Sequence, residues 1–147
     1  MITIGNIFHT NPAEFDEVWI ICFSVAEIQE LFAIKNVRHV PELAPREELF
    51  WIYRTMVHAN QWNKSSFEKY YVPRFLKDIQ NSSSIKLLKK LVSLSKKEDI
   101  RLACFCTDEE EHLCHRSIVA GILFHMGADI ECKEEYRVYR IDTSLLK

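Results

Sequence analysis

One short segment, CFCTDEEEHLCHRS at 104–117, holds most of the residue types that could carry out chemistry. Two thiols could act as nucleophiles or metal ligands, a histidine and a carboxylate could move protons, and an arginine and a hydroxyl could hold an anion. The candidates within it, in chain order, are Cys106, Asp108, Cys114, His115, Arg116 and Ser117. The segment therefore allows three kinds of site: an anion pocket, a reactive thiol or a metal centre.

An anion pocket is the leading interpretation. The segment joins an apolar run to a helical run, and ligands of α/β sheets bind at such crossings. A helix N-terminus offers free backbone N–H groups and the positive end of the dipole, to which Arg116 adds a forked charged donor. We expect an anionic small molecule, such as a nucleotide, at 106–117, with Cys114, His115 and Asp108 as catalytic candidates. Arg116→Lys should then weaken ligand binding and leave the melting temperature almost unchanged. The structural alternative is that Arg116 pairs with an acid of 108–111 and ties the loop down.

A thiol- or metal-dependent enzyme using Cys106, Cys114 and His115 is the second interpretation. Cys114 at a helix start beside Arg116 should have a lowered pKa. However, Arg116 follows Cys114 by two positions and Cys106 by ten, so neither spacing builds a phosphatase-type loop. The C-x₇-C-H spacing also differs from the paired knuckles of structural zinc sites. We expect no cofactor, with zinc as the alternative that the ligand types allow. The third interpretation is a non-enzymatic interaction protein with a structural CHR segment.

The flanking sequence predicts the elements that position this segment. Apolar runs at 1–8, 17–23 and 100–106 are typical of strands buried in parallel sheets, and 36–40 allows another. Further strands are predicted at 128–132 and 136–141, and helices at 25–33, 46–59, 65–80, 85–97 and 114–126, the last ended by Gly127. The alternation predicts one domain over 1–147 with a three-layer, Rossmann-like α/β fold: a small, mostly parallel sheet with helices on both faces. The strand at 100–106 should lie inside the sheet.

Composition limits the partners. Nineteen basic and 21 acidic residues give a net charge of −2, which does not favour wrapping a nucleic-acid backbone. No apolar run approaches the roughly 18 to 20 residues of a membrane span, and the N-terminus lacks a secretory signal pattern. Five cysteines, an odd number, do not suit a secreted disulfide scaffold. We expect a cytoplasmic protein with reduced cysteines, in which Cys22 and Cys132 pack inside strands.

The stretch LACFCTDEEEHLCHRSIVAGIL resembles the C-terminal signature of the family called domain of unknown function 488 (DUF488): a strand ending in C-x-E or C-x-D, an acidic loop, and CHR opening a helix. The stretches ELAPREELFWIYR (42–54) and WNKSSFEKYYVPRFLKDI (62–79) are similar to its LAP segment and W…F…Y-V-P block, and TIGN (3–6) to its T-I-G-H. The resemblance supports the fold and carries over as site candidates Cys106, Asp108, Cys114, His115 and Arg116, with Arg46 in addition. Asn6, at the family's common histidine position, is a further ligand-binding candidate, and Asp108 replaces the common glutamate.

Overall fold

The computed structural model describes residues 1–146 and has a four-stranded, all-parallel sheet at its centre. The strands are β1 (Ile2–Asn6), β2 (Glu17–Ile20), β3 (Val37–His39) and β4 (Ile100–Cys104), in the order β1-β4-β2-β3. As predicted, β4 lies inside the sheet, paired with β1 on one side and β2 on the other. Its register pairs Cys104 with Asn6 and Ala103 with Ile20, so the carboxyl ends of three strands meet.

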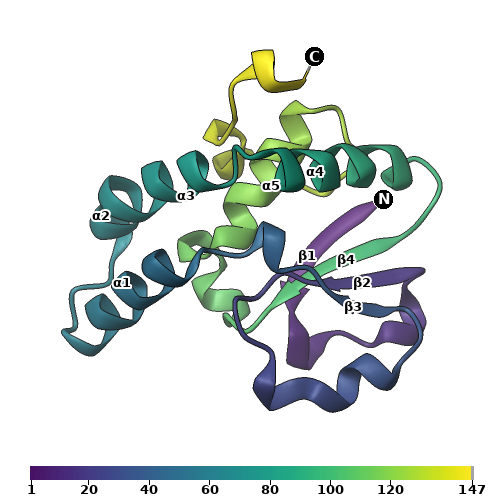
Figure 1. Ribbon diagram of the computed structural model, residues 1–147, viewed down its shortest axis with the longest axis horizontal. Helices are drawn as coiled ribbons and strands as arrows, with labels where there is room; N and C mark the ends of the chain where they lie inside the picture. The colour runs from purple at the N-terminus through teal and green to yellow at the C-terminus, as the bar shows by residue number, and fades with distance from the viewer. Residues whose placement is uncertain (147) are drawn as a thin grey trace.

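Helices cover both faces of this sheet, which makes the fold the predicted three-layer α/β arrangement (Figure 1). The α-helices are α1 (Glu47–His58), α2 (Lys64–Ser66), α3 (Val72–Asp78), α4 (Ser82–Ser95) and α5 (His115–His125). Short 3₁₀ helices cover the other face: Ile7–His9, Pro12–Glu14 and Ala26–Ala33. Further 3₁₀ turns span Pro41–Leu43, Asp108–Leu113, Glu134–Val138 and Thr143–Leu146. In Figure 1, α3 and α4 cross above α5, and α1 projects beside them.

The helix α5 is the central helix of this layer. Its residues from His115 to Leu123 are all buried, because it packs on β1 and β4 and is covered in turn by α3 and α4. Gly127, at φ +90°, follows its last turn, where a left-handed conformation favours glycine. The predicted helix at 114–126 is therefore confirmed to within a residue at each end.

A π-helical turn, Phe67–Tyr71, joins α2 to α3 at the predicted proline kink. Pro73 has no backbone N–H, and its ring would collide with the carbonyl four residues earlier in a regular α-helix. The chain avoids this with a wider turn, in which the Val72 N–H donates to the Phe67 carbonyl. Tyr71, the last residue of this turn, is buried in the core.

Several sequence-based expectations are wrong in detail. Residues 136–141 form no strand; a 3₁₀ turn covers Glu134–Val138 and packs on α5. Residues 128–132 contribute only a single bridge, between Ile130 and Ile2. Cys132 therefore lies outside a strand, and Cys22 is buried two residues beyond the end of β2. Residues 26–33 form a 3₁₀ helix broken at Ile28 instead of an α-helix. In each segment, packing against α5 or the sheet overrides the local pattern.

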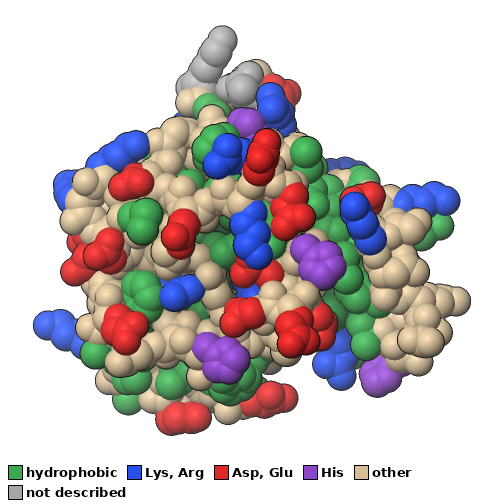
Figure 2. Space-filling model, turned by 180° about the vertical axis from the view of Figure 1, so that it is seen from behind, with side chains coloured by type: hydrophobic (Ala, Val, Ile, Leu, Met, Phe, Trp, Pro, Cys, Tyr) green, Lys and Arg blue, Asp and Glu red, His purple; other side chains and the backbone are tan. Residues whose placement is uncertain are grey.

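Within residues 1–146, no helix has the length and apolar character needed to cross a membrane. On the face seen in Figure 2, basic and acidic side chains are intermingled. All five cysteines are free thiols.

Candidate functional site

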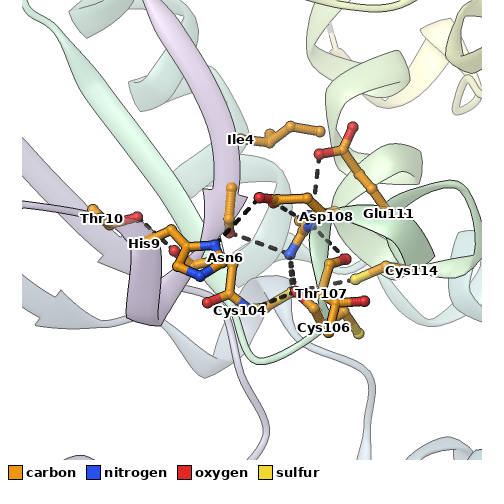
Figure 3. Close-up of polar contacts among 12 residues, drawn as sticks. Ile4, Asn6, His9, Thr10, Cys104, Cys106, Thr107, Asp108, Glu111 and Cys114 are labelled. Atoms are coloured by element: carbon orange, nitrogen blue, oxygen red, sulfur yellow. Dashed lines mark hydrogen bonds and ion pairs between the residues drawn. The ribbon is translucent and has the colours of Figure 1, made fainter.

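All the candidate residues except Arg46 gather where β1 and β4 end and α5 begins (Figure 3). After β4 the chain forms a short loop at 105–107 and the 3₁₀ turn Asp108–Leu113, and it then enters α5 through Cys114. Cys114 is the N-cap of α5, with the extended backbone that this position requires. The strand-to-helix crossing expected from the sequence is therefore present at the carboxyl edge of the sheet.

Three cysteines converge at this crossing. The Sγ atoms of Cys104, Cys106 and Cys114, hereafter the cysteine cluster, all lie within 4.8 Å of one another. The Sγ atoms of Cys104 and Cys114 are 3.2 Å apart. Cys104 and Cys114 are 1% and 2% exposed, whereas Cys106 is only partly buried. Cys106 is therefore the member of the cluster that solvent reaches.

Arg116 lies in the first turn of α5, as predicted, but its side chain is fully buried. Its guanidinium donates to Gly5 O (3.3 Å), Cys104 Sγ (3.2 Å), Cys106 O (2.7 Å), Thr107 O (3.1 Å) and Asp108 Oδ1 (3.3 Å). An ion pair with Glu111 adds a further contact at 3.5 Å. The loop at 105–108 folds over the guanidinium and supplies its acceptors, and the pairing with Asp108 and Glu111 is the structural alternative that the sequence left open.

Asn6 fixes the same loop from β1. Its Nδ2 donates to the carbonyls of Phe105 (3.2 Å) and Cys106 (2.8 Å), and its Oδ1 accepts from the Phe8 N–H. Together, Asn6 and Arg116 bind every backbone carbonyl from 105 to 107. The loop is therefore held from two sides, and this holds the Cys106 sulfur beside the other two.

His115 is a buried neutral imidazole next to the cluster. Its Nε2 donates to the Ile21 carbonyl, and because a carbonyl can only accept, Nδ1 is left with a free lone pair. Nδ1 lies 3.6 Å from the Cys114 Sγ. Burial lowers the pKa of His115, which favours this neutral form.

The surroundings favour negative charge on Cys104. Hydrogen bonds from Cys106 and then from Cys114 lower the pKa of Cys104 well below its usual value. The hydrogen bond to Cys104 raises the pKa of Cys106 to about 12. Burial raises the pKa of Cys114 well above its usual value, which is the opposite of the lowering expected from its position at the helix start. Arg116, which donates to the Cys104 sulfur at 3.2 Å, and the positive end of the α5 dipole act on Cys104 in the same direction.

The remaining predicted residues divide into two groups. Asp108 is 59% exposed and bridges Arg116 and His9, and Ser117 is buried with its hydroxyl donating to the Cys114 carbonyl at 2.7 Å. Both belong to the crossing. Arg46 does not: it precedes α1, contacts the Asp78 carbonyl at 3.4 Å, and lines a shallow hollow of about 890 Å³ along α1.

Two features of the site escaped sequence reasoning. Cys104 is not among the site candidates of the sequence analysis, although the Cys-x-Cys spacing puts it on the same strand face as Cys106. Glu111, which is 9% exposed, is held by the Tyr136 hydroxyl at 2.9 Å and by Lys133 at 3.5 Å. No signal in the acidic run marked Glu111 as the buried member, because Tyr136 and Lys133 lie more than 20 residues further along the chain.

Comparison with known families adds one match. A family model named DUF488-N3a and described as "Active DUF488-N3 subclade" matches residues 12–127. The match covers β2 to β4, α1 to α5 and the entire cysteine cluster. No curated protein and no solved structure gives a significant match.

Proposed function

Because the chain belongs to the DUF488 family, whose matching subclade is described as active, we propose that it is a thiol-dependent enzyme. The observation that carries the proposal is the convergence of three sulfurs at one strand-to-helix crossing, with Cys106 alone partly open to solvent. Cys106 is the thiol that an electrophilic substrate reaches, and its proton passes to the Cys104 thiolate, to which it is hydrogen-bonded, as its sulfur attacks. Arg116 stabilises the negative charge on Cys104, and the neutral His115 accepts a hydrogen bond from the Cys114 thiol.

The geometry favours this function over the anion pocket. An anion site needs free donors, and both terminal nitrogens of the Arg116 guanidinium already bind protein atoms. Ser117 likewise donates its hydroxyl to a backbone carbonyl. Binding of a nucleotide or another anionic molecule would require the loop at 105–108 to move away, whereas a thiol reaction at Cys106 requires only access from solvent.

Alkylation tests this proposal directly. In metal-free native protein, iodoacetamide should modify Cys106 at least about tenfold faster than Cys104 or Cys114. The two buried thiols react only when the structure around them opens, and an opening free energy of only about 1.4 kcal/mol gives that factor. Peptide mapping after timed quenching measures the three rates. Unfolding in denaturant should make all three sites equally reactive.

Cys132 supplies the internal control, because it is also partly buried but lies outside the cluster. Its labelling shows that the reagent is active and should be unchanged in Cys106→Ser. If Cys106 stays unmodified while Cys132 is labelled, no electrophile of that size reaches the cluster, and the thiol proposal fails.

A further inference from the structure

The separations within the cysteine cluster suit a shared ligand. Zinc bound to thiolates at about 2.3 Å in tetrahedral geometry places the sulfurs about 3.8 Å apart. The Cys104 and Cys114 sulfurs are 3.2 Å apart and no pair is more than 4.8 Å apart, and the spacing around zinc falls between these two values. Small side-chain rotations would bring all three onto one ion without moving the strand or the helix.

The charge of the surroundings matches the same ligand. Three thiolates around a divalent cation carry a net charge of −1, which would be costly to bury alone. Arg116, fully buried and bonded to the Cys104 sulfur at 3.2 Å, supplies the opposite charge in direct contact. The guanidinium shares its charge with Asp108 and with Glu111, which Lys133 also contacts, so it contributes to balancing a metal–thiolate centre.

The protein offers three ligands and leaves a fourth position. Among the described residues, the three sulfurs form the group of mutually close ligand atoms. His115 is not in this group, and its Nδ1 lies 3.6 Å from the Cys114 sulfur. Three protein ligands with one open position are typical of catalytic zinc sites, while structural sites are closed by four. The partly exposed Cys106 marks the side from which a water molecule or substrate would enter.

We infer that the cysteine cluster binds one soft divalent cation of the zinc class through Cys104, Cys106 and Cys114, with a fourth coordination position open. The inference rests on the proposed function, because it places the metal on the same thiols that the proposal makes reactive. Binding forms three sulfur–metal bonds and releases to solvent the protons still held by the thiols. The ligand pattern is C-x-C-x₇-C, which includes Cys104 and differs from the C-x₇-C-H spacing considered from the sequence.

Metal titration of the reduced, metal-free protein tests this inference. Zn²⁺ should bind at one ion per chain and raise the melting temperature, and Co²⁺ should give a thiolate-to-cobalt charge-transfer band. Cys106→Ser should weaken Zn²⁺ binding by at least about 100-fold and abolish the band. This partly exposed position is chosen so that the variant folds, which its circular dichroism should confirm. Cys132→Ser, outside the cluster, should bind as the unaltered protein does.

The outcomes separate the two proposals. If Zn²⁺ binds weakly or equally well to Cys106→Ser, the metal site is refuted, and selective alkylation of Cys106 would still support a metal-free thiol enzyme. If Zn²⁺ binds as expected and Cys106 of the metal-free protein resists alkylation, the metal inference stands and the thiol nucleophile does not. Where both hold, added Zn²⁺ should protect Cys106 from iodoacetamide.

Discussion

Replacing Arg116 with leucine should lower the free energy of unfolding by about 3 to 5 kcal/mol, a loss typical of breaking a buried charged network. Leucine removes the donors for the carbonyls of Gly5, Cys106 and Thr107 and leaves Glu111 without its buried cation. A buried acceptor without a partner retains its full desolvation cost, so these losses add to that of the charge. Chemical denaturation monitored by circular dichroism measures the change.

Arg116→Lys should lower the free energy of unfolding by less than the replacement with leucine. Lysine keeps the charge, but its single ammonium cannot span acceptors that two guanidinium nitrogens now reach. We expect a loss of about 2 kcal/mol, from one or two buried acceptors left without a donor. The sequence alone led to the opposite expectation, an almost unchanged melting temperature.

Arg54→Lys provides the matched control, since Arg54 is exposed on α1 and the substitution should change stability by less than about 0.5 kcal/mol. A result in which Arg116→Lys is as neutral as Arg54→Lys would mean that the loop at 105–108 is not anchored by the guanidinium. The anion-pocket interpretation would then regain its main support.

The parts of the fold that could be predicted are those whose signal is local. The run at 100–106 is apolar at nearly every position, and such a run can be buried on both faces only inside a sheet, where β4 lies. The start and end of α5 were likewise predictable, from the crossing at 106–114 and from Gly127. These features require no knowledge of what the segments touch.

The chemistry of the site depended on contacts that a sequence does not display. Arg116 was correctly placed at the helix start, but its burial follows from Asn6 and Gly5 on a strand about 100 residues away. The same holds for Cys104, whose sulfur meets Cys114 because β4 and α5 pack together. Alternation in 136–141 suggested a strand, yet the sheet edge beside β1 takes only Ile130, and Tyr136 instead turns its hydroxyl to Glu111.

Gly121→Ala should destabilise the protein by about 2 kcal/mol, although alanine is the better helix former by about 1 kcal/mol. A Cβ atom at this position in α5 would lie 2.1 Å from the Tyr136 carbonyl oxygen and 2.9 Å from the Tyr139 Cβ. The first of these atoms is backbone, so the C-terminal segment must move as a whole, and overpacking outweighs the gain in helix propensity. Thermal and chemical denaturation report the net effect.

Gly127→Ala separates packing from backbone strain. No atom lies within 4 Å of a Cβ there, but φ is +90°, so we expect a loss of about 1 kcal/mol from conformation alone.

The position of Tyr136 also links Gly121 to the site, because its hydroxyl holds Glu111, which in turn pairs with Arg116. Gly121→Ala should therefore also speed alkylation of Cys114, and Gly127→Ala should not. A stabilised Gly121→Ala protein with an unchanged Cys114 would show that the C-terminal segment neither packs on α5 nor supports the cysteine cluster.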